Sequence, residues 1–193
     1  RVKSPEELTG LTGLTPIGVV PYQLMANGQG AITLDDEHQR SSLAESYKFA
    51  RTNLEFLALG TSGIKTLLVT SSGPGEGKTT TAANLAISLA KEGNATIVVD
   101  TDLRKPSLHK IFDIKQPKGL TEVLIGSATL DEALAETSIP QLRVLPCGIM
   151  PPDPIPVLRS SNMSELMSQL KEKADMVIID TPPLLVVTDP LVL

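Results

Sequence analysis

The chain has 193 residues, of which 41% are hydrophobic and 20% charged, a composition typical of a folded globular protein and not of a disordered or fibrous one. Its 17 basic and 22 acidic residues give a formal net charge of −5, which offers no overall attraction to nucleic acid or to an anionic membrane. The single cysteine, Cys147, has no partner for an internal disulfide, so we expect a buried thiol. The first residue is Arg1 and not methionine, which suggests a piece of a longer protein.

Residues 1–40 differ from the rest of the chain. Threonine, glycine and proline are scattered through their first half, and a polar stretch, ANGQGAITLDDEHQR, follows. Only residues 17–20 have the apolar pattern of a short strand, and residues 28–40 are predicted to be loop. We therefore expect residues 1–40 to form an N-terminal arm and residues 41–193 to form the folded domain.

A helix is predicted over residues 42–59, because apolar residues recur at three- and four-residue spacing and Gly60 follows. The apolar residues are Leu43, Tyr47, Ala50, Leu54 and Leu57. Glu45, Lys48 and Arg51 lie three residues apart and are expected to share one polar face. From spacing alone, this face is solvated and carries one weak ion pair.

From residue 65 onward, strand-like and helical segments alternate. Strands are predicted at residues 65–72, 95–100, 142–146 and 176–180. Helical segments are predicted between them at residues 78–92, 106–112, 120–125, 129–136 and 161–173. This order implies a doubly wound α/β fold with a parallel sheet and flanking helices, in which ligands bind beyond the carboxyl ends of the strands.

The stretch SSGPGEGKTT, residues 71–80, is a glycine-rich loop between a predicted strand and a predicted helix. Backbone N–H groups in such a loop converge on phosphate, Lys78 can reach the β- and γ-phosphates, and the Thr79 hydroxyl can bind Mg²⁺. The pattern G-x-x-x-x-G-K-[ST] is met except at its first position, Ser72. The alternative, a glycine-rich turn with a stray surface lysine, is disfavoured by the strand, loop and helix order. The candidate nucleotide-binding residues are Gly73, Gly75, Glu76, Gly77, Lys78, Thr79 and Thr80.

Aspartates end two of the predicted strands. Asp100 and Asp102 lie two residues apart, so both carboxylates are expected on one side of the chain, facing the glycine-rich loop. Asp180 ends the apolar stretch MVIID and precedes TPP, which excludes a helix. Such aspartates often only form turns, but beside a triphosphate site they are candidate Mg²⁺ ligands. Arg104 would either contact phosphate or pair with a surface carboxylate, and the sequence leaves both open.

Three stretches, SSGPGEGKTT, VVDTDLRKPSLH and VIIDTPP, together resemble the Walker A, A′ and B motifs of the bacterial tyrosine kinases that regulate capsule and exopolysaccharide export. The resemblance covers most of the chain, and the A′ stretch is its most distinctive part. It implies a P-loop NTPase-like fold and an ATP-dependent protein tyrosine autokinase with ATP and Mg²⁺ as cofactors. Lys78 and Thr79 would lie on the phosphates and Mg²⁺, and Asp102 and Asp180 around the metal. Asp100 would be the base that receives a tyrosyl proton, which makes Lys78, Asp100 and Asp102 the expected catalytic residues.

The resemblance also implies partners. The family has an E-x-x-R-x-x-R signature that joins neighbouring subunits in a ring, and Glu45, Lys48 and Arg51 match it except for the middle lysine, which lacks the bidentate fork of arginine. The stretch PEELTGLTGLTPIGVVPY resembles the segment after the second membrane helix of fused chain-length determinants. We therefore expect a membrane-spanning chain-length determinant region in the same or a partner chain, and an opposing tyrosine phosphatase. This segment, itself soluble, is expected on the cytoplasmic side of the bacterial inner membrane, with no nucleic acid partner.

The resemblance further implies that the domain continues beyond residue 193. Asp189 and Pro190 have the pattern of a helix start, and only a first turn follows. A complete domain would add the rest of that helix, further strands and a tyrosine-rich tail, so residues 41–193 are expected to be incomplete. Tyr22 and Tyr47 are the only tyrosines in the sequence.

Two other functions stay open. An ATPase of the ParA/MinD type shares the fold and the two-aspartate strand end, but it carries a lysine early in the loop, K-G-G-x-G-K-T, where this chain has Gly73. A non-catalytic adaptor that binds ATP to set the shape of an export complex would use the same residues as the kinase. Transfer of labelled phosphate from ATP to tyrosine distinguishes the three functions.

Overall fold

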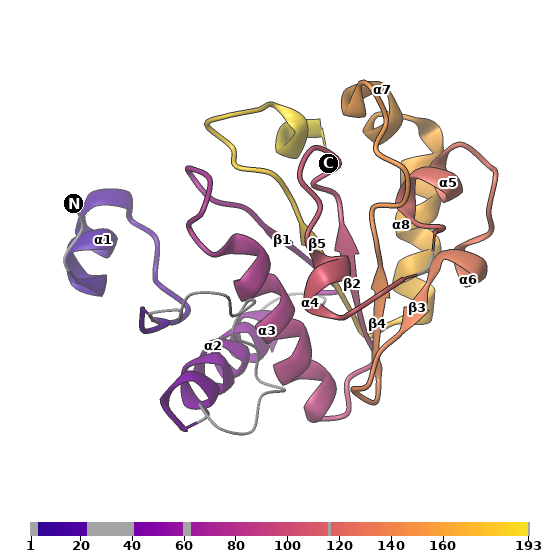
Figure 1. The fold of residues 1–193 in the computed structure, drawn as a ribbon. Helices are drawn as coiled ribbons and strands as arrows, with labels where there is room; N and C mark the ends of the chain where they lie inside the picture. The colour runs from indigo at the N-terminus through magenta and orange to yellow at the C-terminus, as the bar shows by residue number, and fades with distance from the viewer. Residues whose placement is uncertain (1–3, 23–40, 60–62, 116, 193) are drawn as a thin grey trace. The chain divides into compact units, whose positions relative to one another are not determined.

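The computed structural model describes residues 4–22, 41–59, 63–115 and 117–192 (Figure 1). It contains two compact units, residues 1–64 and residues 65–193. The sequence predicts a boundary after residue 40, whereas the first compact unit extends to residue 64 and includes the helix over residues 41–59. The loop predicted at residues 28–40 lies outside the described residues. None of the described helices is both long and apolar enough to cross a membrane.

The first unit contains two helices, α1 (Pro5–Thr12) and α2 (Ser41–Leu59). Helix α1 was not predicted; it begins after the Ser4 N-cap, whose hydroxyl accepts a hydrogen bond from Glu7 N, and it ends at Gly13 in the left-handed conformation. The strand predicted at residues 17–20 is wrong, since these residues form no strand.

Residues 17–20 instead pack on α2. Gly18 lies so close to Ala50 that a Cβ on the glycine would be 2.9 Å from the alanine Cβ, and the Asn53 side chain donates a hydrogen bond to Ile17 O (2.8 Å). The apolar face of α2 is buried as its spacing predicts, except for Leu57, which is exposed. The buried residues are Leu43, Tyr47, Ala50 and Leu54.

The second unit is built on a five-stranded sheet of order β1-β5-β2-β4-β3. Its strands are β1 (Thr66–Val69), β2 (Thr96–Asp100), β3 (Ala135–Glu136), β4 (Leu142–Leu145) and β5 (Met176–Asp180). Strands β1, β5, β2 and β4 are parallel, and β3 is antiparallel to β4. The predicted parallel α/β sheet is therefore confirmed. Short strand β3 takes the end of the helix predicted over residues 129–136, because Ala135 and Glu136 pair with β4.

Helices cover both faces of the sheet (Figure 1). The helices of this unit are α3 (Lys78–Lys91), α4 (Leu108–Ile111), α5 (Leu120–Leu124), α6 (Leu130–Ala133), α7 (Pro154–Leu158), α8 (Ser161–Lys173) and the 3₁₀ helix η1 (Asp189–Val192). Helix α7 was not predicted, and η1 forms at the predicted helix start. Helix α3 packs on the sheet from one side, while α5 and α8 lie on the other (Figure 1).

The alternation of side chains along β2 and β5 decides which face the acidic residues share. Ile97, Val99, Val177 and Ile179 belong to the core with residues of α5 and α8. The residues of opposite parity, which include Asp100 and Asp180, therefore point toward the α3 face. This places both carboxyl groups on the side of the sheet where α3 begins.

The loop after β4 approaches the N-terminus of α5 very closely. Leu120 N and Thr121 N donate to Pro146 O (2.7 Å) and Cys147 O (3.0 Å), and the buried Glu122 carboxylate accepts from Gly119 N (2.8 Å) and Ile149 N (3.1 Å). A Cβ on Gly119 would overlap Pro146 O and the backbone of the residues after it. Glycine is therefore required at this position by the close approach of two backbones.

We predict that Gly119→Ala lowers the free energy of unfolding by about 1–3 kcal/mol, because backbone atoms cannot move aside as a flexible side chain can. Urea denaturation followed by circular dichroism measures the change. Gly10→Ala is the control: Gly10 lies within α1, where a Cβ meets no atom within 4 Å, so this variant should be neutral or slightly stabilising. Equal stability of Gly119→Ala and the natural protein would contradict the prediction.

Candidate nucleotide-binding site

The phosphate loop, residues 70–77, connects β1 to α3 and is closed on itself by Glu76. The Glu76 carboxylate accepts hydrogen bonds from Ser72 N (3.0 Å), Gly73 N (3.1 Å) and the Ser72 hydroxyl (2.9 Å). These bonds hold the pKa of Glu76 below its usual value. Gly75 and Gly77 have φ of 76° and 87°, a backbone conformation that favours glycine. Each of the four loop residues predicted to bind nucleotide therefore helps to fix the loop conformation. Gly73 and Glu76 do so through hydrogen bonds, and Gly75 and Gly77 through their positive φ.

Lys78 and Thr79 begin helix α3 directly after this loop. Lys78 Nζ lies 3.0 Å from Asp102 Oδ2, 3.2 Å from Thr79 Oγ1 and 4.0 Å from Asp180 Oδ1. The Thr79 hydroxyl donates to Asp180 Oδ2 (2.7 Å). Because the first N–H groups of a helix have no intrahelical acceptor, those of Lys78, Thr79 and Thr80 are available to an anion at this end of α3.

The two strand ends meet because β2 and β5 are neighbours in register, with Asp100 paired with Asp180. Asp102 lies beyond the end of β2 and accepts from Lys105 N at Oδ1 (3.0 Å). Asp100 Oδ2 accepts from Ser107 N and Leu108 N, both at 3.0 Å, so this carboxylate is held by the start of α4. The two aspartates, expected to face the phosphate loop together, thus have different partners.

Burial changes the protonation of the two paired aspartates. Asp100 and Asp180 are both fully buried. Desolvation, with the neighbouring Asp180 charge, raises the pKa of Asp100 to about 7. Desolvation also raises the pKa of Asp180, to about 6, against the opposing effect of Lys78. Asp100 Oδ1 and Asp180 Oδ1 are buried without a hydrogen-bond partner, so each has a free acceptor position for a ligand.

These residues fit a magnesium ion that is held only partly by protein. The donors are all oxygen atoms, the Thr79 hydroxyl and the Asp102 and Asp180 carboxylates, which Mg²⁺ prefers. Within the described part of the chain, no three His, Cys, Asp or Glu side chains are grouped to hold a metal by themselves. Mg²⁺ usually takes one or two carboxylates together with phosphate oxygens and water, so such a group is not required.

Arg104, for which the sequence left two roles open, pairs with a carboxylate. Its Nε and Nη2 donate to Asp189 Oδ2 (2.8 Å) and Oδ1 (3.1 Å). The partner was not predicted, because Asp189 lies 85 residues further along the chain and is fully buried. No local pattern around Arg104 indicates this pairing.

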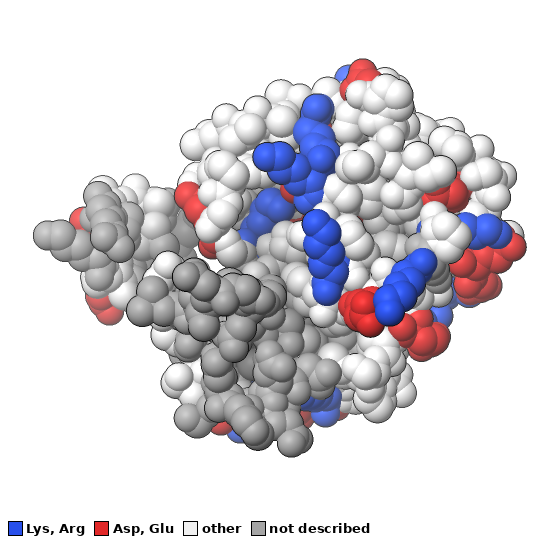
Figure 2. All heavy atoms as spheres, viewed as in Figure 1, with Lys and Arg blue, Asp and Glu red and all other residues white. Residues whose placement is uncertain are grey.

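The surface around the strand ends is locally basic although the whole chain is acidic. Figure 2 shows Lys and Arg side chains gathered on the part of this face between α4 and α7. The overall charge of −5 therefore does not describe the field at the candidate site.

Two other features lie outside this site. Cys147 is buried as expected, and burial raises the pKa of its thiol to about 12, so it is unreactive.

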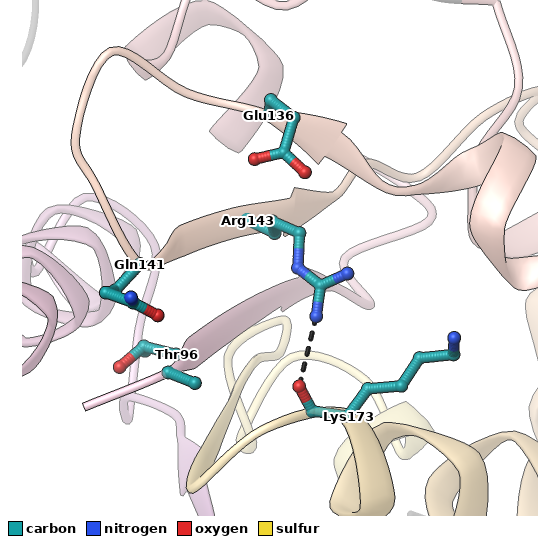
Figure 3. Close-up of a pocket in the computed structure, with 6 residues that line it drawn as sticks. Thr96, Glu136, Gln141, Arg143 and Lys173 are labelled. Atoms are coloured by element: carbon teal, nitrogen blue, oxygen red, sulfur yellow. Dashed lines mark hydrogen bonds between the residues drawn. The ribbon is translucent and has the colours of Figure 1, made fainter. Parts of the chain in front are cut away.

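A hollow of about 310 Å³ lies at the amino ends of β2 and β4, the opposite edge of the sheet from Asp100. Arg143 there donates to Lys173 O (3.0 Å) from the middle of the hollow (Figure 3). Its polar, open lining gives no sign of a catalytic arrangement.

We predict that stability falls as the pH rises from about 4 to about 7 in metal-free buffer. In this window the unfolded chain has lost the Asp100 proton, whose ordinary pKa is 3.8, while the folded chain keeps it up to about 7. Each unit of pKa difference corresponds to roughly 1.4 kcal/mol, so Asp100→Asn should be more stable than the natural protein at pH 8 and lose less stability across the window.

Urea denaturation at pH 4.5, 6 and 8 with a chelator measures this dependence. Asp113→Asn, at an exposed aspartate, is the control and should follow the natural protein. Parallel pH curves for Asp100→Asn and the natural protein would contradict the raised pKa.

Comparison with known proteins places this geometry in a family. A family model described as an AAA domain matches residues 64–192. Over 154 residues, 80% of the chain, the sequence is 41% identical to tyrosine-protein kinase YwqD of Bacillus subtilis, and the match spans 65% of that protein, less than two thirds of its length.

Solved structures agree with the sequence comparison. The kinase domain of the Escherichia coli tyrosine kinase ETK has a TM-score of 0.87 at 27% identity, over 98% of this chain and 76% of that one. The septum site-determining protein MinD of Pyrococcus horikoshii, complexed with Mg-ADP, has a TM-score of 0.57 at 28% identity, over 66% of this chain and 51% of that one. The P-loop NTPase-like fold is therefore confirmed. The chain belongs to the AAA domain family, and within it to the bacterial tyrosine kinases, as its motifs predicted.

Proposed function

We propose that the chain carries the catalytic site of an ATP- and Mg²⁺-dependent protein tyrosine kinase, which phosphorylates itself and thereby regulates the polymerisation and export of capsule or exopolysaccharide. The observation that carries this proposal is the convergence of Lys78, Thr79, Asp102 and Asp180 within hydrogen-bond or ion-pair distance at the carboxyl edge of the sheet. Phosphoryl transfer needs charge neutralisation and positioning more than covalent chemistry, and this arrangement supplies both.

Each residue near the phosphates has a distinct role in the proposal. The N–H groups of the phosphate loop and of Lys78, Thr79 and Thr80 bind the phosphate oxygens of ATP, and the Lys78 ammonium neutralises the charge between the β- and γ-phosphates. Thr79, Asp102 and Asp180 hold Mg²⁺, which when bound supplies further neutralisation of the phosphates. Lys78 balances the carboxylates of Asp102 and Asp180, so it is held at the site by the protein itself.

Asp100 is the proposed base that receives the proton of the acceptor tyrosine. Ser107 N and Leu108 N hold its Oδ2 in place, which leaves the unpartnered Oδ1 to accept a proton from a phenol. A base works best when its pKa lies near the working pH, and burial raises the pKa of Asp100 to about 7. Of the two tyrosines in this sequence, Tyr47 is buried and Tyr22 is 89% exposed, and neither belongs to a cluster of tyrosines, so we propose neither as the acceptor.

The two alternatives make different use of the same site. A MinD-type ATPase would transfer the phosphoryl group to water, and the Gly73 position lacks the early lysine that such proteins carry. An adaptor would bind ATP and transfer nothing. We favour the kinase, because Asp100 has a free buried acceptor atom that neither binding alone nor Mg²⁺ coordination by Asp102 and Asp180 uses.

We predict that Lys78→Met reduces phosphoryl transfer on the order of 10²–10³-fold and weakens ATP binding, because it removes the charge beside the γ-phosphate. Asp100→Asn should reduce transfer on the order of 10²-fold or more but leave nucleotide affinity nearly unchanged, because it removes a base and keeps the shape of the side chain. The measurement uses labelled ATP with Mg²⁺ and a random Glu/Tyr copolymer as acceptor.

The destination of the label separates the three functions. Label on tyrosine supports the kinase, release of free phosphate alone supports the ATPase, and nucleotide binding without either supports the adaptor. Transfer that is unchanged in Lys78→Met would rule out the proposed site. Equal losses of binding and transfer in Asp100→Asn would assign Asp100 to the metal instead.

We also propose that α2 joins copies of the chain in a ring through Glu45 and Lys48. Both side chains are exposed, and Phe49 and Phe56, which are 61% and 66% exposed, lie on the same side of the helix. Aromatic anchors beside charged pairs are typical of protein interfaces. Arg51 departs from the expected polar face, because it is 7% exposed and its Nε lies 3.6 Å from Glu55.

We predict that Glu45→Ala with Lys48→Ala lowers the oligomer mass to that of a monomer without loss of stability, since both residues are exposed. Light scattering and a urea curve measure the two properties. Arg51→Ala is the contrasting variant: it removes a buried guanidinium and should lower the stability as well. An unchanged oligomer mass in the double variant would contradict the ring contact and indicate that this face of α2 is only solvated.

The arm segment over residues 5–22 supports a place beside a membrane-spanning chain-length determinant region, in the same or a partner chain, on the cytoplasmic side of the bacterial inner membrane. A tyrosine phosphatase would oppose the kinase. We propose no nucleic acid partner.

A further inference from the structure

The pair formed by Arg104 and Asp189 joins two segments that leave the carboxyl edge of the sheet separately. Arg104 lies in the A′ loop, residues 101–107, which follows β2. Asp189 begins η1, at the end of the post-β5 segment, residues 181–188. Two parallel hydrogen bonds of 2.8 and 3.1 Å connect the guanidinium to both oxygens of the carboxylate. This bidentate geometry fixes the orientation of the two segments more strongly than a single contact would.

The two residues of the pair differ in their exposure to solvent. The Asp189 side chain has no exposed surface, whereas 41% of the Arg104 side chain is exposed. A buried carboxylate requires its charge to be compensated, and a guanidinium at the surface supplies this compensation with little loss of its own hydration. The pair is therefore not an ordinary surface ion pair, whose partners are both hydrated.

The post-β5 segment is attached to the phosphate loop at its other end. Thr181 N donates to Val69 O (3.1 Å), the Thr70 hydroxyl donates to Pro182 O (3.0 Å), and Leu184 N donates to Ser71 O (2.8 Å). The segment thus follows Asp180, runs beside the start of the phosphate loop and leads to Asp189, which pairs with Arg104. Through this pair, the segments that follow β1, β2 and β5 are all connected to one another at the carboxyl edge of the sheet.

The backbone next to Arg104 orients the two aspartates of the A′ loop and β2. Lys105 N donates to Asp102 Oδ1, and Ser107 N and Leu108 N donate to Asp100 Oδ2, all at 3.0 Å. Any shift of the A′ loop would move these N–H groups away from the carboxylates. Arg104 attaches this loop to Asp189, while Lys78 Nζ binds Asp102 Oδ2.

We propose that Arg104 and Asp189 form a clamp that positions Asp102 for Mg²⁺ and so sets the gain in nucleotide affinity that Mg²⁺ provides. The two residues act through the A′ loop and are positioning residues, not catalytic ones. The inference rests on the proposed function, since it assigns the clamp a role at the proposed nucleotide and metal site.

The experiment measures binding of a fluorescent ADP analogue to the 193-residue chain, once with EDTA and once with Mg²⁺. The variants are Arg104→Lys, which keeps the charge but not the fork, Asp189→Asn, and the two together, with Asp113→Asn as an exposed control. We expect unchanged affinity in EDTA, and a gain from Mg²⁺ that is about 3- to 10-fold smaller in each single variant. The double variant should lose no more than either single variant, because both remove the same interaction.

Hydrogen exchange of the metal-free variants provides a readout that needs no nucleotide. Amides of residues 101–112 should exchange faster in Arg104→Lys and Asp189→Asn, while those of residues 120–134 keep their natural rates. If Asp189→Asn does not fold, Arg104→Lys still decides the question, because it leaves the buried carboxylate with a cation.

Two results would overturn the clamp. One is natural amide protection over residues 101–112 with a natural Mg²⁺ gain in both variants. The other is an equal loss of affinity in EDTA and in Mg²⁺, which would indicate general damage. Failure of the natural protein to bind nucleotide in either buffer would instead reject the proposed function, and faster exchange in the variants would still support the clamp.

Discussion

The constraint on which this site depends is the parallel register of β2 and β5, which pairs Asp100 with Asp180 at one buried edge. Asp180 and Asp102 share one ammonium group, that of Lys78, which lies 4.0 Å from Asp180 Oδ1 and 3.0 Å from Asp102 Oδ2. Desolvation raises the pKa of both paired aspartates, and repulsion adds to it from Asp180 at Asp100 and from Asp102 at Asp180, so this arrangement is unfavourable for the folded chain by itself. An edge built only for stability would not bury so much negative charge, and a bound cation would relieve it.

Several surrounding elements hold these carboxylates in place. Helix α3 brings Lys78 and Thr79 to them from one side, and the amides of the A′ loop hold Asp100 and Asp102 from another. Asp189 in turn anchors Arg104 of the same loop. The donors to these acidic oxygens come from both α3 and the A′ loop, so the geometry requires the carboxyl edge as a whole and not the phosphate loop alone.

The features that depend on neighbouring residues in the chain could be predicted from the sequence. The glycine-rich loop, the four parallel strands and the aspartates at their ends follow from local patterns, and the structure brings Lys78, Thr79, Asp102 and Asp180 together. Features set by tertiary contacts were missed. The partner of Arg104 is 85 residues away in the sequence. Arg51 is buried, although its position predicted a solvated side chain. Residues 135–136 pair with β4 as a strand, although their pattern predicted a helix. No periodicity carries information about such distant partners.

The departure of the phosphate loop from the usual pattern has a structural explanation at Ser72. Where the pattern has a glycine, serine offers both its N–H and its hydroxyl to the Glu76 carboxylate, and Gly73 adds a second N–H. Gly73 also lies near that carboxylate, since a Cβ there would be 3.4 Å from Glu76 Oε1. The first turn of the loop is therefore held by an internal anion, the Glu76 carboxylate. The N–H groups at the start of α3 take no part in these bonds, so the substitution at Ser72 changes how the loop is held while leaving its phosphate-binding end free.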